Sequence, residues 1–272
     1  MRRQKHRGLA AALMASAALL YLGWAAAERT RVPLTIEVIA PGGDIPAAGM
    51  IEEDAPTVLI YHTHTWEAYE MADEARYTPT ETWRTKDDAH NMVRVGEALG
   101  EALTERGFAV THDKTAFEPP NLSAAYTRSL AMLEKRLAAG ETYDYILDVH
   151  RDAYSEGSGA NTVTQNGVSI ARVMMLVGKG TGTTGSGFDA RPDWPQNLAL
   201  AQEITDAMNA ALPGVARDVR IKSGRFNQHI STSALLIEVG NNRNTLCEAL
   251  AACEVIADGV AAVHARRAAI QD

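Results

Sequence analysis

Cysteine is almost absent from this chain of 272 residues. The two cysteines, Cys247 and Cys253, lie six residues apart in a predicted helix, so they do not share a helical face. No CxxC pair is present, which excludes a zinc site of that type, and we expect two buried free thiols. With 46% hydrophobic and 22% charged residues, the composition is that of a globular protein. It excludes a disordered chain, a collagen-like repeat and a multi-span membrane protein.

Basic residues are in deficit, and no internal repeat is visible. The chain has 26 Lys and Arg against 34 Asp and Glu, and residues 1–27 hold four of these bases and no acid. Nucleic acid binding depends on Lys and Arg that neutralise phosphates, so we expect no nucleic acid partner. The stretch Gly178–Asp189 is rich in glycine but lacks the order G-x-x-x-x-G-K-[ST], and we expect a mobile loop beside a cleft there rather than a nucleotide site.

Residues 1–27 have the pattern of an export segment. A basic start is followed by the uncharged run 8–27, which is long enough to span a bilayer as a helix. The alanines at 25–27 also form a site of the kind that signal peptidases cut. The segment is therefore either a single-pass anchor in the cell membrane or a signal peptide removed after Ala27. In both cases we expect the rest of the chain outside the cytoplasm, beginning with a linker at 28–56 that is rich in proline and glycine.

Strands and helices are predicted to alternate from residue 57 to the end of the chain. Apolar runs predict strands at 57–62, 108–112, 143–150, 172–177, 219–222 and 233–239. Apolar residues at three- and four-residue spacing predict helices at 89–106, 123–139, 194–212 and 246–267, the second capped by Ser123. This alternation indicates one three-layer α/β domain over 57–272, with a mainly parallel or mixed sheet flanked by helices.

Ionisable residues lie at the ends of three of these strands, at the edge where sites form in such sheets. They are His64, His150 and Glu238. A catalytic zinc ion takes three protein ligands and keeps a position for water, whose pKa it lowers towards roughly 7. A further carboxylate must take and return the proton. The strand ends supply two histidine ligands and, in Glu238, that proton acceptor.

The remaining histidines and one nearby acid have competing interpretations. The spacing His64-x-x-Glu67 occurs in some zinc peptidases but is weak by itself. If the first strand stays regular, His62 points to the same side as His64, where it is either a ligand or a support for one. We expect three further histidines to lie at the surface or to pack against neighbouring residues: His90, His112 and His264.

Five segments of the chain resemble a known family. They are VLIYHTHTWEAY (58–69), RTKDDAHNMVRVGEAL (84–99), YILDVHRDA (145–153), DWPQNLALA (193–201) and FNQHISTSALLIEVGNNRNT (226–245). In this order they are similar to the stage II sporulation protein P family, which belongs with the zinc-dependent N-acetylmuramoyl-L-alanine amidases. The blocks YHTHT and DVHRD together carry most of the resemblance.

The resemblance implies a zinc amidase or exopeptidase-like α/β fold and hydrolysis of peptidoglycan. The expected bond is the amide between N-acetylmuramic acid and L-alanine, and an endopeptidase activity is also ascribed to the family. The expected setting is septal wall remodelling and engulfment during sporulation. The expected partner is a lytic transglycosylase of the stage II sporulation protein D type.

The resemblance also implies roles for single residues. The two zinc histidines of the amidases fall on His64 and His150, and the catalytic glutamate falls on Glu238. The third zinc ligand is left open between Asp87, which lies four residues before an asparagine as in the wider amidases, and Glu67, which belongs to the HTH-x-x-E block. Asp87 could instead cap a helix start.

Two further polar residues are candidates for substrate binding. Arg151 directly follows a zinc histidine and either binds a peptide carboxylate or forms a structural ion pair with a neighbouring aspartate. Asn241 lies after the Glu238 strand and either positions substrate or builds a turn. Two other functions stay open: a zinc endo- or carboxypeptidase that cuts stem peptides, and a domain that binds the cell wall without cutting it.

Overall fold

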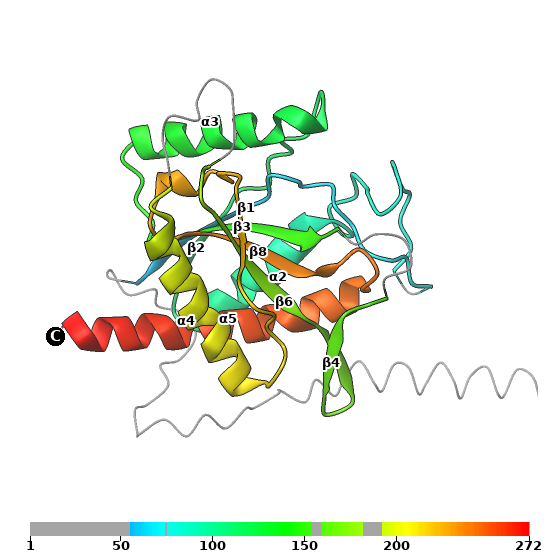
Figure 1. Cartoon of the computed structure of the whole chain (residues 1–272). Coiled ribbons are helices and arrows are strands. Elements are labelled where there is room, and N and C mark those ends of the chain that lie inside the picture. The colour runs from blue at the N-terminus through cyan, green and yellow to red at the C-terminus, as the bar shows by residue number, and fades with distance from the viewer. Residues whose placement is uncertain (1–54, 74, 154–158, 182–191, 272) are drawn as a thin grey trace, which may run out of the picture. The chain divides into compact units, whose positions relative to one another are not determined.

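A mixed six-stranded sheet lies at the centre of the computed structural model (Figure 1). Its strands are, in the order in which they lie side by side, β2 (Ala109–His112), β1 (Thr57–Tyr61), β3 (Tyr145–Asp152), β8 (Ala234–Asn241), β6 (Val173–Gly178) and β7 (Arg220–Lys222). Neighbours β6 and β8 are antiparallel, and the other neighbours are parallel. The predicted α/β class and mixed sheet are thus confirmed.

The structure describes residues 55–73, 75–153, 159–181 and 192–271, which lie in one compact unit of the chain. The predicted export segment at 1–27, nearly all of the predicted linker at 28–56 and most of the glycine-rich stretch Gly178–Asp189 lie outside these residues. Within the described ranges, no helix is both long and apolar enough to cross a membrane.

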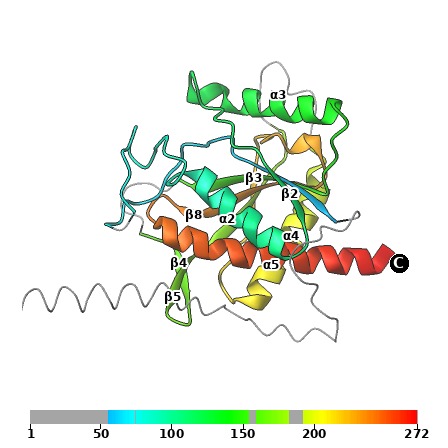
Figure 2. The ribbon, with the colours of Figure 1, turned by 180° about the vertical axis from the view of Figure 1, so that it is seen from behind.

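Helices cover the sheet on both faces. The helices α2 (Met92–Glu105), α4 (Trp194–Ala211) and α5 (Leu246–Gln271) pack against one face, and Figure 2 shows α2 and α5 in front of the sheet from behind. The helix α3 (Ala125–Ala138) packs against the opposite face (Figure 1). The four central strands β1, β3, β8 and β6 are therefore buried on both sides, which explains their continuous apolar runs in the sequence.

Alternation along the strands decides which side chains face α3. Successive residues of a strand point to opposite faces. In β3, Leu147 and Val149 belong to the core under α2, α4 and α5, whereas Ile146 packs on the α3 side. Asp148 and His150 lie two and four residues after Ile146, so their side chains point to the same face as that of Ile146. They therefore lie on the α3 face of the sheet, at the end of the strand.

Two helix starts differ from the predictions at their caps. Asn91 caps α2 with its side chain, which accepts a hydrogen bond from the backbone N–H of Val93, so the helix begins later than predicted. The predicted cap Ser123 is wrong, because Asn121 accepts the hydrogen bond from the backbone N–H of Ala124 and begins a short 3-10 turn ahead of α3. Asparagine is as good a cap as serine, and it comes first in the chain.

An antiparallel hairpin was not predicted. The strands β4 (Thr162–Gln165) and β5 (Val168–Ala171) pair with each other outside the main sheet. Asn166 and Gly167 connect them with φ angles of 51° and 81°. An Asn-Gly pair between two short apolar stretches is a strong hairpin signal because both residues tolerate positive φ. The sequence therefore contained the necessary information.

The cysteine prediction is half confirmed. Both cysteines are free thiols. Cys253 is buried in the core, but Cys247 is exposed at the start of α5. Their six-residue spacing places them on different sides of the helix, so one can face the core while the other faces solvent.

Replacing Gly96 by Ala is expected to lower the free energy of unfolding by about 1–3 kcal/mol. A Cβ atom at Gly96 would lie 2.5 Å from the Nε2 atoms of both His62 and His112, so the packing of α2 on β1 must shift. Gly100→Ala in the same helix is the control, since its Cβ would meet Val110 at 3.4 Å. Chemical denaturation of both variants tests this, and equal stability of the two would contradict the described packing.

Candidate active site

The carboxyl ends of three neighbouring strands bring the predicted site residues together. Strands β1, β3 and β8 are adjacent and parallel, so their ends meet at one edge of the sheet. His64 lies in the turn after β1, and His150 and Glu238 lie near the ends of the other two strands. His150 and Glu238 are direct partners in the strand register. Both side chains therefore lie on the same face of the sheet.

The two predicted zinc histidines face each other. The rings of His64 and His150 have centroids 5.4 Å apart and lie nearly perpendicular. The Nδ1 atom of His64 is buried without a hydrogen-bond partner and lies 3.8 Å from an oxygen of Glu118. Burial, followed by the nearby charge of His150, lowers the pKa of His64 to about 4. His64 is therefore neutral near pH 7, as a metal ligand must be.

His150 lies between two carboxylates. Its Nε2 atom is 2.8 Å from Oδ1 of Asp148, and its Nδ1 atom is 3.5 Å from Oε2 of Glu67. Although burial lowers the pKa of His150, these two carboxylates raise it well above its usual value. The two carboxylates thus favour the protonated form of His150.

Glu67 is fixed in place by Arg151. The backbone N–H of Arg151 donates to Oε2 of Glu67 at 3.3 Å, and the guanidinium lies 3.8 Å from Oε1. The same guanidinium donates to the carbonyl oxygens of Ala68 and Trp83. Burial raises the pKa of Glu67, but Arg151 and His150 lower it to about 2. Glu67 is a permanent anion, and Arg151 is paired with it rather than with a neighbouring aspartate.

The rival ligand Asp87 lies at the surface. Its side chain is 47% exposed and binds His90, with Oδ2 at 2.9 Å from Nδ1. It also accepts a hydrogen bond from the backbone N–H of Ala89. Asp87 thus stabilises the turn before α2 but does not cap that helix, because Asn91 is the cap. The structure brings Glu67, of the two candidates, against His150.

The side chain of Glu238 is largely buried, and one of its carboxyl oxygens accepts no hydrogen bond. Its Oε2 atom is buried and has no hydrogen-bond partner. Burial raises the pKa of Glu238 to about 7, although the charge of His150 opposes this increase. A carboxyl group with such a pKa can both accept and release a proton near neutral pH, as a general base requires.

Sequence reasoning gave no role to three residues that surround the histidines. Asp148 accepts hydrogen bonds from the backbone and hydroxyl of Thr63 and thereby fixes its carboxylate beside His150. Glu118 pairs with Arg84 and accepts from the backbone N–H of Trp66. The ring of Tyr126 in α3 stacks over His150 and meets His64 edge-on. Asp148 could have been identified from the sequence, because it lies two residues before His150 in the same strand. Glu118 and Tyr126 belong to no motif that connects them with the histidines.

The prediction that His62 points the same way as His64 is wrong. The strand β1 ends at Tyr61, and the chain then turns, so the alternation does not continue to His64. His62 instead faces α2, where its Nδ1 atom binds the carbonyl of Val149 and its Nε2 atom binds His112. His62 therefore packs behind the sheet edge, on the face away from the two site histidines.

Asn241 belongs to a turn after β8. Its side chain accepts from the backbone N–H of Arg243 at 2.7 Å and donates to the carbonyl of Gly159 at 3.3 Å. It is 1% exposed. These contacts are those of the turn-building alternative.

The types of donor group at this edge of the sheet are those that bind a divalent metal ion. Two imidazoles and one carboxylate are frequent ligands of zinc, and the orphaned Nδ1 atom of His64 has the free lone pair that a ligand needs. In the described ranges, however, no three His, Cys, Asp or Glu side chains are already arranged as a metal site. His150 instead lies beside the carboxylates of Asp148 and Glu67, which favour its protonated form. A metal ion that binds His150 must compete with that proton.

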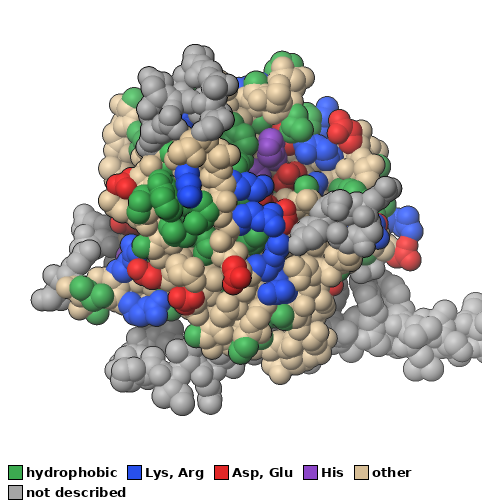
Figure 3. All heavy atoms as spheres, in the orientation of Figure 1, with side chains coloured by type: hydrophobic (Ala, Val, Ile, Leu, Met, Phe, Trp, Pro, Cys, Tyr) green, Lys and Arg blue, Asp and Glu red, His purple; other side chains and the backbone are tan. Residues whose placement is uncertain are grey.

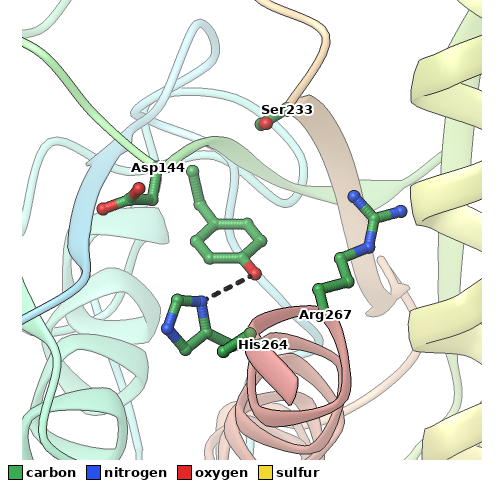
Figure 4. Close-up of a pocket in the computed structure, with 6 residues that line it drawn as sticks. Asp144, Ser233, His264 and Arg267 are labelled. Atoms are coloured by element: carbon green, nitrogen blue, oxygen red, sulfur yellow. Dashed lines mark hydrogen bonds between the residues drawn. The ribbon is translucent and has the colours of Figure 1, made fainter. Parts of the chain in front are cut away.

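A hollow on the surface leads to acidic and histidine side chains, with Lys and Arg side chains beside it (Figure 3). A separate cavity of about 230 Å³ lies at the other end of the strands, where β3 and β8 begin. Its lining includes Asp144, Ser233 and Arg267, and Tyr145 donates a hydrogen bond to His264 there (Figure 4). This cavity lies at the edge opposite the carboxyl ends that carry the site.

Comparisons with known proteins agree with the resemblance. The family model described as stage II sporulation protein P (SpoIIP) matches residues 25–261. A curated protein from Bacillus subtilis (strain 168), named stage II sporulation protein P, is 30% identical over 216 residues, which are 75% of this chain and 50% of that protein. The chain thus spans about half the length of this relative.

A solved structure shares the fold. It is the CwlD amidase from Clostridioides difficile in complex with the GerS lipoprotein, with a TM-score of 0.51 and 12% sequence identity. The similarity covers 79% of this chain and 99% of that one. At this identity it supports the predicted amidase-like architecture.

Proposed function

Because the chain belongs to the stage II sporulation protein P family, we propose that it is a zinc-dependent hydrolase of peptidoglycan, with its catalytic domain at 57–272. The bond cleaved is the amide between N-acetylmuramic acid and L-alanine. The observation that carries this proposal is the meeting of His64, His150 and Glu67 beside Glu238 at one sheet edge. The fold shared with an amidase supports it.

In this proposal His64, His150 and Glu67 hold the zinc ion. When bound, zinc acts as a Lewis acid that polarises the scissile carbonyl and lowers the pKa of water. An oxygen of Asp148 lies 2.8 Å from Nε2 of the His150 ring, on the side away from Nδ1, which faces Glu67. A carboxylate behind a histidine ligand fixes the ring orientation and raises its basicity. Arg151 likewise fixes the orientation of the Glu67 carboxylate, although its positive charge lowers the basicity of that carboxylate.

Glu238 moves the proton. As a carboxylate it takes a proton from the attacking water, and as an acid it returns that proton to the amine of the leaving L-alanine. Its orphaned Oε2 atom is the group available for this exchange. Its register position opposite His150 keeps it beside the ligands.

The wider setting is part of the proposal. The basic start and uncharged run of residues 1–27 favour a domain held outside the cytoplasm at the cell membrane, or secreted after cleavage. There it would act on septal peptidoglycan during engulfment, together with a lytic transglycosylase of the stage II sporulation protein D type.

Digestion of purified sacculi tests the reaction. We expect the full chain to release intact stem peptides from the glycan, to lose this activity on treatment with a chelator, and to regain it with zinc. Fragments cut within the stem would indicate an endo- or carboxypeptidase. Sacculus binding without release of peptide would indicate a wall-binding domain.

A further inference from the structure

A cavity of about 460 Å³ lies next to Glu238 on the sheet. It is lined by Arg172, Met174, Ala216, Arg217, Asp218, Val219 and Arg220. Met174 in β6 is the register partner of Glu238 in β8, so the floor of the cavity directly adjoins the proposed general base. This arginine pocket (Arg172, Arg217 and Arg220) therefore lies next to Glu238 on the sheet.

The arginine pocket keeps a surplus of positive charge. The guanidinium groups of Arg217 and Arg220 lie 2.9 Å and 3.9 Å from the same oxygen of Asp152, which follows His150 by two residues. Arg172 is held by neutral acceptors, the carbonyl of Gly214 and the side chain of Asn161. Among the described residues, the lining of the pocket thus carries three cations and one anion, Asp218, with Asp152 beside it. The pocket is positive on a chain whose net charge is −8.

Of the three arginines in the arginine pocket, Arg220 is the one whose side chain we expect a ligand to reach. It is 41% exposed, and its contact with Asp152 is at the outer limit of an ion pair. The planar guanidinium matches the two oxygens of a carboxylate and binds it more strongly than a neutral group. The pocket therefore favours an anionic group over an amide of the same size.

We propose that the arginine pocket binds a free carboxylate of the leaving peptide, on the residue that follows L-alanine. This inference rests on the proposed amidase function. Of the two halves of that substrate, the N-acetylated glycan is neutral, and the peptide carries the carboxylates. A positive pocket beside Glu238 thus orients the peptide half and makes the enzyme selective for acidic stems over amidated ones.

Two matched substrates test the inference. Both are N-acetylmuramoyl dipeptides of L-Ala-D-Glu whose γ-carboxyl group is blocked as its methylamide, and they differ only in having a free α-carboxylate or an α-carboxamide. We expect the wild type to cleave the acid with a KM about tenfold lower, and Arg220→Gln to raise that KM about tenfold with little change in kcat, as for loss of one charged hydrogen bond. The KM for the carboxamide should not change in the variant.

Arg243→Gln is the control, because this arginine is equally exposed at 43% but pairs with Glu70 on another loop. It should leave both substrates unaffected. Equal KM values for acid and carboxamide in the wild type, or the same change on both substrates in Arg220→Gln, would overturn the inference and leave the amidase function standing. Thermal unfolding of each variant shows whether the fold is intact.

Binding of the free dipeptides separates the inference from the proposed function. If the wild type cleaves neither substrate, the amidase function fails. Calorimetry with the same γ-blocked pair of dipeptides, the α-carboxylate and the α-carboxamide, then tests the pocket. Equal or absent binding of the two overturns the inference. Binding of poly(glycerol phosphate) that is lost in Arg220→Gln, with no difference between the dipeptides, would also overturn it.

Discussion

Glu238→Gln is expected to reduce cleavage by roughly 10³-fold, because a positioned general base contributes about 10²–10⁴ to the rate. The glutamine has the same size but cannot accept the proton of water. Since Oε2 of Glu238 has no hydrogen-bond partner, the change at this atom breaks no hydrogen bond, and the fold and the zinc content should remain. Steady-state rates on a soluble muramoyl peptide, with zinc determined in the same samples, measure the effect.

The pH profile provides the control for this role. Burial raises the pKa of Glu238 to about 7, so below that pH the group is protonated and cannot act as a base. The wild-type rate should therefore rise as the pH increases through about 7, and the residual rate of Glu238→Gln should lack this step. A variant that cuts at the wild-type rate would show that another group takes the proton.

Glu67→Ala is expected to weaken zinc binding by at least about 100-fold and to abolish cleavage, while Asp87→Ala keeps both. Loss of a supporting residue alone typically costs 10–100-fold in metal affinity, and a ligand contributes more. Glu67 is an anion against His150, with a pKa of about 2, whereas Asp87 is exposed and bound to His90. Zinc titration of the two variants decides the third ligand.

The fold of the Glu67 variant needs its own control, because the change removes the carboxylate partner of the buried Arg151. Glu67→Gln keeps the size of the side chain and an acceptor for Arg151. It should remain folded by thermal unfolding and still bind zinc more weakly than the wild type. Loss of zinc in Asp87→Ala with full retention in both Glu67 variants would reverse the assignment.

Strand ends could be predicted from the sequence because buried strands are continuous apolar runs. His150 and Glu238 terminate such runs, and the parallel order of β3 and β8 made them partners in the register. The prediction that His62 and His64 point to the same side was wrong. The strand β1 ends one residue earlier than predicted, and the chain turns before His64. Where a strand stops depends on the packing of its neighbours, which a single run of residues does not contain.

Contacts from distant segments could not be predicted. Glu118 reaches His64 from an irregular segment between β2 and α3, and Tyr126 reaches both histidines from α3. No periodicity connects these positions with the strand ends. The choice between Glu67 and Asp87 likewise depends on where the turn after β1 places each side chain, so the sequence left it open.

The most direct test of the account is the identity of the amino groups that appear when zinc is added to the zinc-free full chain with purified peptidoglycan. The account predicts that α-amino groups of L-alanine appear only after zinc is added, in equal number to the stem peptides released. New amino groups on any other residue, or release that proceeds without metal, would contradict a zinc-dependent amidase built on His64, His150 and Glu67.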